Sequence, residues 1–169
     1  SHNDKTFTYT IYDCSGGSVL GTPTYKPNIS AFDNGTIILN QSSIAVSFVF
    51  NNLTSFMIPI NLGNQNIGVV YNTSSVWTGS YPWYGKFNDT HFYALYMLSG
   101  TTRIGLFHVD SNSKIIQSLS LDIGYSVISY PQFIGGTKNL MIFFEDKSYI
   151  QIYLPTLTIK QVYTNFAPV

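Results

Sequence analysis

Charged side chains are scarce in this sequence. Asp, Glu, Lys and Arg make up 9% of the 169 residues, against roughly 25% in a typical soluble domain. The eight basic and eight acidic residues cancel, and the Lys and Arg residues form no cluster. Nucleic-acid binding begins with neutralisation of phosphates by basic side chains, so we expect no nucleic-acid partner. Recruitment to an anionic lipid surface is disfavoured for the same reason.

Long apolar runs and cysteines are also lacking. No run approaches the roughly 18 apolar residues that a membrane-spanning helix needs, so we expect no membrane insertion. The single cysteine, Cys14, has no second cysteine in the chain with which to form a disulfide. Hydrophobic residues still make up 44% of the chain and aromatic residues 16%. This is enough for one domain with an apolar core, and we expect residues 1–169 to form a single domain.

Helical periodicity is absent from every stretch of the chain. Short apolar or alternating runs recur instead, rich in Ile, Val, Phe, Tyr and Thr and bounded by Gly, Asn, Asp, Ser and Pro. Examples are "SIAVSFVF", "HFYALYML" and "YIQIYLP". This composition and spacing are typical of β-strands. The sequence therefore predicts an all-β fold.

Three segments align on a proline without gaps, with repeat distances of 55 and 49 residues. Ten residues after each of Pro27, Pro82 and Pro131, an apolar run begins, and two further strand-like runs follow it. The predicted strands are 37–39, 44–50 and 56–62 in the first unit, 92–95, 104–110 and 115–121 in the second, and 141–144, 149–155 and 159–165 in the third. Each unit is predicted to be a proline-led strand, two central strands and an outer strand. The repeat units span approximately 26–80, 81–129 and 130–169, after an N-terminal two-strand piece at 5–25.

The middle unit, "HFYALYMLSGTTRIGLFHVDSNSKIIQSLSL", has the strand order of a β-propeller blade. In its pattern the chain resembles the extracellular NHL/YVTN-like class of propellers, which implies propeller-type four-stranded repeats but no particular functional residue. Three units and the N-terminal piece give about three to four blades, whereas closed propellers have about four to eight. The chain would then be a compact ring, or half of a larger propeller completed by a second copy or a further chain. A β-trefoil or a β-sandwich are the alternatives.

The acidic residues and histidines form no pattern typical of catalysis or metal binding. Glu145 is the only glutamate, and most of the acids occur in turn-like contexts, where they commonly bind backbone amides. His91 and His108 lie seventeen residues apart, with no further ligand at metal-site spacing. The "DSNSK" run at Asp110 begins like a calcium loop but places Lys114 at a ligand position, which favours a hairpin turn. We therefore expect no enzyme activity, no metal and no cofactor.

Asparagine sequons indicate the compartment. Six N-x-S/T motifs occur, about twice the number expected by chance. Attached glycans would supply the hydrophilicity that charge does not. We therefore expect a secreted or cell-surface glycoprotein, with these sequon asparagines as glycosylation candidates: Asn28, Asn34, Asn40, Asn52, Asn72 and Asn88.

Aromatic residues supply the remaining functional prediction. Thirteen Tyr and two Trp in a charge-poor chain suit recognition of proteins or glycans, since the rings combine a flat apolar face with a polar handle. We expect a non-enzymatic binding or adhesion module with a protein or glycan partner, and self-association is an option. A carbohydrate-binding, lectin-like module and a fragment of a secreted propeller hydrolase are the alternatives. The ligand-binding candidates lie in the connection before the second unit: Trp77, Tyr81, Trp83 and Tyr84.

Overall fold

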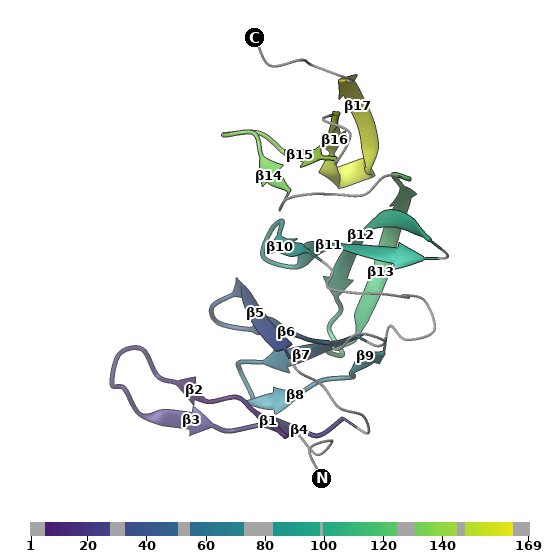
Figure 1. Cartoon of the computed structure of the whole chain (residues 1–169). Helices are drawn as coiled ribbons and strands as arrows, with labels where there is room; N and C mark the ends of the chain where they lie inside the picture. The colour runs from purple at the N-terminus through teal and green to yellow at the C-terminus, as the bar shows by residue number, and fades with distance from the viewer. Residues whose placement is uncertain are drawn as a thin grey trace.

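A computed structural model describes residues 6–27, 33–50, 55–72, 83–98, 100–124, 131–144 and 148–163. Within them the chain is all-β, as predicted; its strands pair antiparallel, and its one helical element is the 3-10 turn η1 (Leu154–Thr156). No helix long and apolar enough to span a membrane occurs in this part of the chain. The strands form three sheets of four or five strands and two short N-terminal ribbons, stacked in sequence order from the N-terminus to the C-terminus (Figure 1).

The first sheet contains β5 (Asp33–Asn40), β6 (Ile44–Phe50), β7 (Ser55–Asn61), β8 (Asn66–Ile67) and β9 (Tyr71–Asn72). Both β8 and β9 pair with β7. The unit predicted here has a strand led by Pro27 before its central strands, but residues 28–32 lie outside the described residues. The five-strand order also departs from the predicted four, because two further short strands, β8 and β9, pair with β7. Between these two strands, Val69 donates its N–H to the carbonyl oxygen of Ser113, which lies in the 110–114 turn of the next sheet.

The second and third sheets have the predicted strand order. The second contains β10 (Tyr84–Lys86), β11 (His91–Leu98), β12 (Thr101–Val109) and β13 (Ile115–Asp122). The third contains β14 (Gln132–Phe133), β15 (Asn139–Phe143), β16 (Tyr149–Tyr153) and β17 (Thr158–Tyr163). Each is a four-stranded antiparallel meander whose first strand is short. The coarse prediction of small four-stranded antiparallel sheets is therefore confirmed for both.

The sheets pack face to face through two apolar layers. One layer joins the first sheet to the second and includes Phe48, Met57, Phe92 and Phe107. The other joins the second sheet to the third and includes Leu95, Ile104, Leu140, Ile142 and Ile152. Because the second sheet is covered on both faces, β11 is a nearly continuous buried run rather than an alternating one. In β15 and β16 buried and partly exposed residues alternate, because among the described residues one face of the third sheet packs on the second sheet and the other does not.

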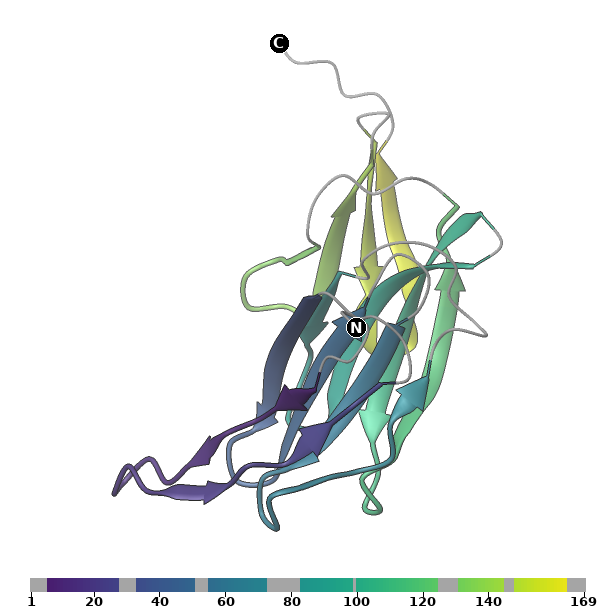
Figure 2. The same ribbon diagram turned by 60° about the horizontal axis from the view of Figure 1, so that its bottom comes forward.

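The N-terminal piece is one irregular β-hairpin, and each of its two arms is divided into two short strands. Its ribbons are β1 (Phe7–Thr8) with β4 (Thr24–Tyr25), and β2 (Ile11–Tyr12) with β3 (Val19–Gly21). The hairpin covers the free face of the first sheet, where Phe7, Tyr9 and Tyr25 pack on a core that includes Val49 and Ile58. Its tip extends away from the stack (Figure 2). Among the described residues the N-terminal strands pair only with one another, so the stack is open and no closed ring is formed.

Candidate binding site

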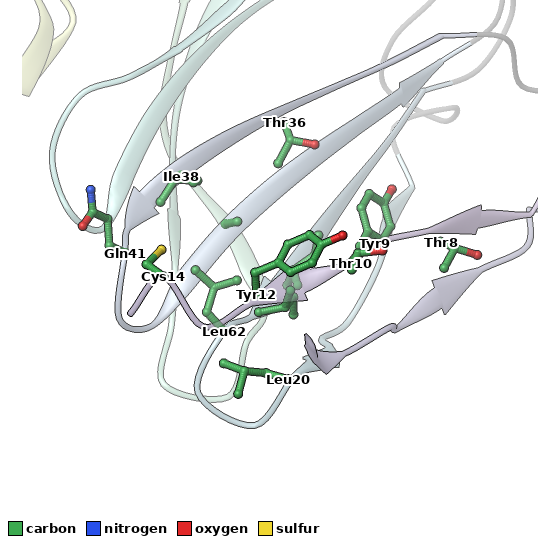
Figure 3. Close-up of a pocket in the computed structure, with 13 residues that line it drawn as sticks. Thr8, Tyr9, Thr10, Tyr12, Cys14, Leu20, Thr36, Ile38, Gln41 and Leu62 are labelled. Atoms are coloured by element: carbon green, nitrogen blue, oxygen red, sulfur yellow. The ribbon is translucent and has the colours of Figure 1, made fainter. Parts of the chain in front are cut away.

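A cleft of about 600 Å³ lies between the N-terminal hairpin and the first sheet (Figure 3). The hairpin contributes one wall, and β5 with the turn after it contributes the other. Residues of β6 and β7 complete the lining. The lining residues are Thr8, Tyr9, Thr10, Ile11, Tyr12, Cys14, Leu20, Thr36, Ile38, Gln41, Ala45, Ile60 and Leu62.

Part of the cleft lining belongs to the core and is rigidly held. Ala45 and Ile60 are buried, and Tyr9 packs half-buried against the same core cluster. The Tyr9 hydroxyl forms a 2.7 Å hydrogen bond with Oγ of the fully buried Ser47. Burial raises the pKa of Tyr9, although the Ser47 hydrogen bond acts in the opposite direction. Tyr9 is therefore a neutral, fixed part of the site at physiological pH.

The tip of the hairpin is shaped by a tight turn. Asp13 Oδ1 accepts hydrogen bonds from the N–H and the hydroxyl of Ser15, at 3.0 and 2.8 Å. These bonds, the side-chain one first, lower the pKa of Asp13. The turn leaves Cys14 exposed as a free thiol. Asp13 therefore acts as a turn residue, as its short polar side chain would suggest.

The outer arm of the hairpin is held close to the first sheet at Gly21. A Cβ at this position would lie 2.5 Å from Cβ of Gln65, in the turn between β7 and β8. Only glycine permits so close an approach of the two segments. Gly21 therefore sets how near β3 and Leu20 come to the first sheet.

The cleft has an uncharged lining. Its lining has no acidic, basic or histidine side chain, and its polar groups are hydroxyls, one amide and one thiol. Tyr12, Leu20 and Ile38 remain 58%, 49% and 54% exposed there, so apolar surface faces solvent. The arrangement suits an uncharged ligand that presents an apolar surface and a few hydrogen-bonding groups.

Of the residues predicted to bind a ligand, Trp83 and Tyr84 do not line the cleft. Trp77 and Tyr81 fall outside the described residues. Tyr84 stacks on Phe48 in the layer between the first two sheets. Trp83 is half-buried against the layer between the second and third sheets. Their role in ligand binding stays a prediction, but both described rings already take part in packing.

The cleft itself was not predicted from the sequence. Thr alternates with Phe, Tyr and Ile in the "TFTYTIY" run, which signals a strand with two different faces. The sequence does not say that this strand docks across the first sheet with its tip left free. That placement depends on long-range contacts such as Tyr9 with Ser47.

Two histidines that are distant in sequence lie side by side in the second sheet. His91 of β11 is the direct cross-strand partner of His108 of β12, and their ring centroids are 5.2 Å apart. Burial first, and the neighbouring His108 second, lower the pKa of His91. The sequence contains a signal for this pairing. If Leu98 pairs with Thr101 across a tight turn, pairing the two strands residue by residue away from that turn places His91 opposite His108.

The sequon asparagines are placed in part. Asn72 and Asn88 are exposed and Asn40 is partly exposed. Asn28 and Asn52 lie outside the described residues, as does the side chain of Asn34. Exposure of an asparagine does not test whether it carries a glycan, so glycosylation stays a prediction.

The turn at Asp110 has the predicted hairpin form. Asp110 Oδ1 accepts hydrogen bonds from the N–H groups of Asn112 and Lys114, both at 2.9 Å. The carboxylate is thus used by the backbone. In the described part of the chain no group of three or more His, Cys, Asp or Glu side chains comes together.

Comparison with known proteins gives no relative from which a role could be transferred: no protein-family model and no curated protein matches this chain.

Proposed function

We propose that this protein is a secreted or cell-surface binding module without enzymatic activity, and that it binds a protein partner through the cleft beneath its N-terminal hairpin. One observation carries the proposal. Large exposed hydrophobic side chains line this cleft, where Tyr12, Leu20 and Ile38 are each about half exposed or more. Exposed apolar side chains grouped on one surface commonly mark a site of protein interaction.

Two further features support an extracellular binding role. The charge-poor surface is compensated if glycans occupy the sequons, and two sequon asparagines, Asn72 and Asn88, are exposed. The floor of the cleft, formed by Ala45, Ile60 and the hydrogen-bonded Tyr9, is held in place by the core, and the lining is uncharged. Such a site favours recognition by shape and apolar contact over electrostatic steering.

The experiment is a binding screen against an array of extracellular protein domains. A triple variant, Tyr12→Ser, Leu20→Ser and Ile38→Thr, removes the exposed apolar groups that line the cleft. A matched control, Ile116→Thr with Leu119→Ser, changes two exposed apolar residues of β13 instead. We expect the partner's affinity to fall at least about tenfold for the cleft variant and to be unchanged for the control. Equal binding by both variants would show that the partner uses another surface.

Glycan binding is the second candidate, and Tyr12 favours it. Its ring is 58% exposed in a cleft that also offers the hydroxyls of Thr8, Thr10 and Thr36. An exposed ring beside neutral hydrogen-bonding groups suits the apolar face and hydroxyls of a sugar. A glycan array probed with the protein and with Tyr12→Ala tests this candidate. Loss of a glycan signal in the variant supports it, and absence of any signal from the unmodified protein rejects it.

The fold proposal is that the sheets are propeller-type blades in an open stack that a second copy or another chain completes. Its support is the face-to-face packing of successive antiparallel sheets, the second and third of which are four-stranded meanders. The outward face of the last sheet keeps Met141, Phe143 and Tyr153 partly exposed, as an uncovered blade would. Light scattering distinguishes the alternatives: a dimer supports completion by a second copy, and a monomer at all concentrations rejects it.

A further inference from the structure

The paired histidines of the second sheet form a distinct feature, separate from the cleft. His91 and His108 lie directly opposite one another on β11 and β12, so their side chains project from the same face of the sheet. That face carries Tyr93 and Leu106 further along and meets the third sheet. Both histidines are only partly buried, so solvent reaches the pair.

Each imidazole is oriented through its Nδ1 atom. Nδ1 of His91 lies 3.2 Å from Oδ1 of Asn88, which can only accept, and 2.7 Å from the hydroxyl of Thr90. Asn88 Oδ1 is itself fixed, because it also accepts the backbone N–H groups of Thr90 and His91. The Nδ1 atom of His91 is therefore the one that carries the proton, and Nε2 presents a lone pair.

His108 is held from the opposite side. Its Nδ1 atom lies 2.7 Å from Oγ of Ser118 on β13. Ser118 is the extra residue where the β12–β13 register shifts, between the pairs of Leu106 and Phe107. Such a bulge redirects a side chain that a regular ladder would place elsewhere. Within the described part of the chain neither Nε2 atom has a hydrogen-bond partner.

We propose that His91 and His108 form a two-imidazole chelate for a divalent transition-metal ion, with water in the remaining positions. Neutral imidazole is a favoured ligand of Zn²⁺, Ni²⁺ and Cu²⁺. The Nδ1 partners Asn88, Thr90 and Ser118 supply the supporting hydrogen bonds that such ligands commonly have. This proposal departs from the expectation of no metal site. The two histidines are seventeen residues apart in the sequence, but the pairing of β11 with β12 brings them side by side.

Zinc titration of unglycosylated protein tests the chelate, with the imidazole Cε1–H signals followed by NMR. Because His2 could bind metal beside the N-terminus, the protein carries His2→Asn throughout. We expect the signals of His91 and His108 to shift together with one affinity. His91→Asn and His108→Asn should each weaken zinc binding at least about tenfold, because a chelate needs both rings.

A positioning variant separates a built site from two adventitious histidines. Asn88→Ala removes the acceptor that orients His91, and we expect it to weaken zinc binding several-fold while His108 Nδ1 keeps its Ser118 partner. Lys86→Ala, which breaks only the exposed ion pair with Asp89, is the matched control in the same loop. Two outcomes would overturn the proposal. One is that the His91 and His108 signals shift at different zinc concentrations; the other is that replacing one histidine leaves the zinc affinity of the remaining one unchanged.

Discussion

The ring of Tyr84 lies flat on the ring of Phe48, with 3.8 Å between centroids and 11° between ring planes. The contact joins β10 of the second sheet to β6 of the first. It is possible because β5 has glycine at position 35, where a Cβ would collide with the Tyr84 hydroxyl. Gly35 thus gives Tyr84 room to enter the layer between the sheets.

Gly35→Ala should therefore destabilise the contact between the first two sheets. We expect the free energy of unfolding to fall by about 1–3 kcal/mol, the range typical of overpacking in a closely packed interior. Urea denaturation measures the change. Tyr84→Phe removes the atom that collides most severely, so the loss caused by Gly35→Ala should be smaller in that background. Additive effects in the double variant would contradict the assigned contact.

The sequence predicts the strands better than it predicts the cleft or the histidine pair. Ile44–Phe50 was predicted as a strand and is β6 to the residue, because a run of alternating and β-branched apolar residues between turns has few other conformations. The run from 67 to 72 is split into β8 and β9, because Val69 bonds to the neighbouring hairpin. The strand propensity of these residues does not reveal the distant backbone group, Ser113, to which Val69 donates its N–H. The cleft and the histidine pair depend on docking and register, which lie beyond single-strand patterns.

Phe107 tests whether the layer between the first two sheets is the core of the fold. Its ring is fully buried, stacks on Phe92 at 5.3 Å and contacts Tyr71 edge-on at 6.0 Å. Phe107→Ala should cost about 3–5 kcal/mol of unfolding free energy, as expected for a large buried ring. Phe133→Ala is the control, because Phe133 is 39% exposed and should cost much less. Similar losses in both variants would contradict the assignment of the core.

The sequons give a prediction for expression through a eukaryotic secretory pathway. Asn72 and Asn88 are exposed, so we expect both to carry glycans. Intact-mass analysis before and after enzymatic deglycosylation measures occupancy, and Asn72→Gln and Asn88→Gln should each remove one glycan mass. Secretion of a chain with neither site occupied would weaken the glycoprotein proposal without affecting the cleft.

Alkaline stability follows from the buried tyrosines. Burial is the leading cause that raises the pKa values of Tyr9, Tyr25 and Tyr71 above their ordinary value of 10.0. Below pH 10 these phenols are neutral in the folded and unfolded chains alike, so they impose no pH dependence. Above about pH 10 the unfolded chain releases these protons more readily than the folded chain, and the free energy of unfolding should fall.

Tyr9→Phe isolates one of these groups. At neutral pH the variant loses the hydrogen bond to buried Ser47, and we expect it to cost about 1 kcal/mol of unfolding free energy. Because the variant has one fewer phenol to ionise, its stability should decline less steeply than that of the unmodified protein between about pH 10 and 11. Denaturation curves at several pH values measure both effects. Tyr12→Phe is the control, because the Tyr12 ring is 58% exposed. An alkaline decline as steep in Tyr9→Phe as in the unmodified protein would show that Tyr9 ionises freely in the folded chain, and the floor of the cleft would then be open to solvent.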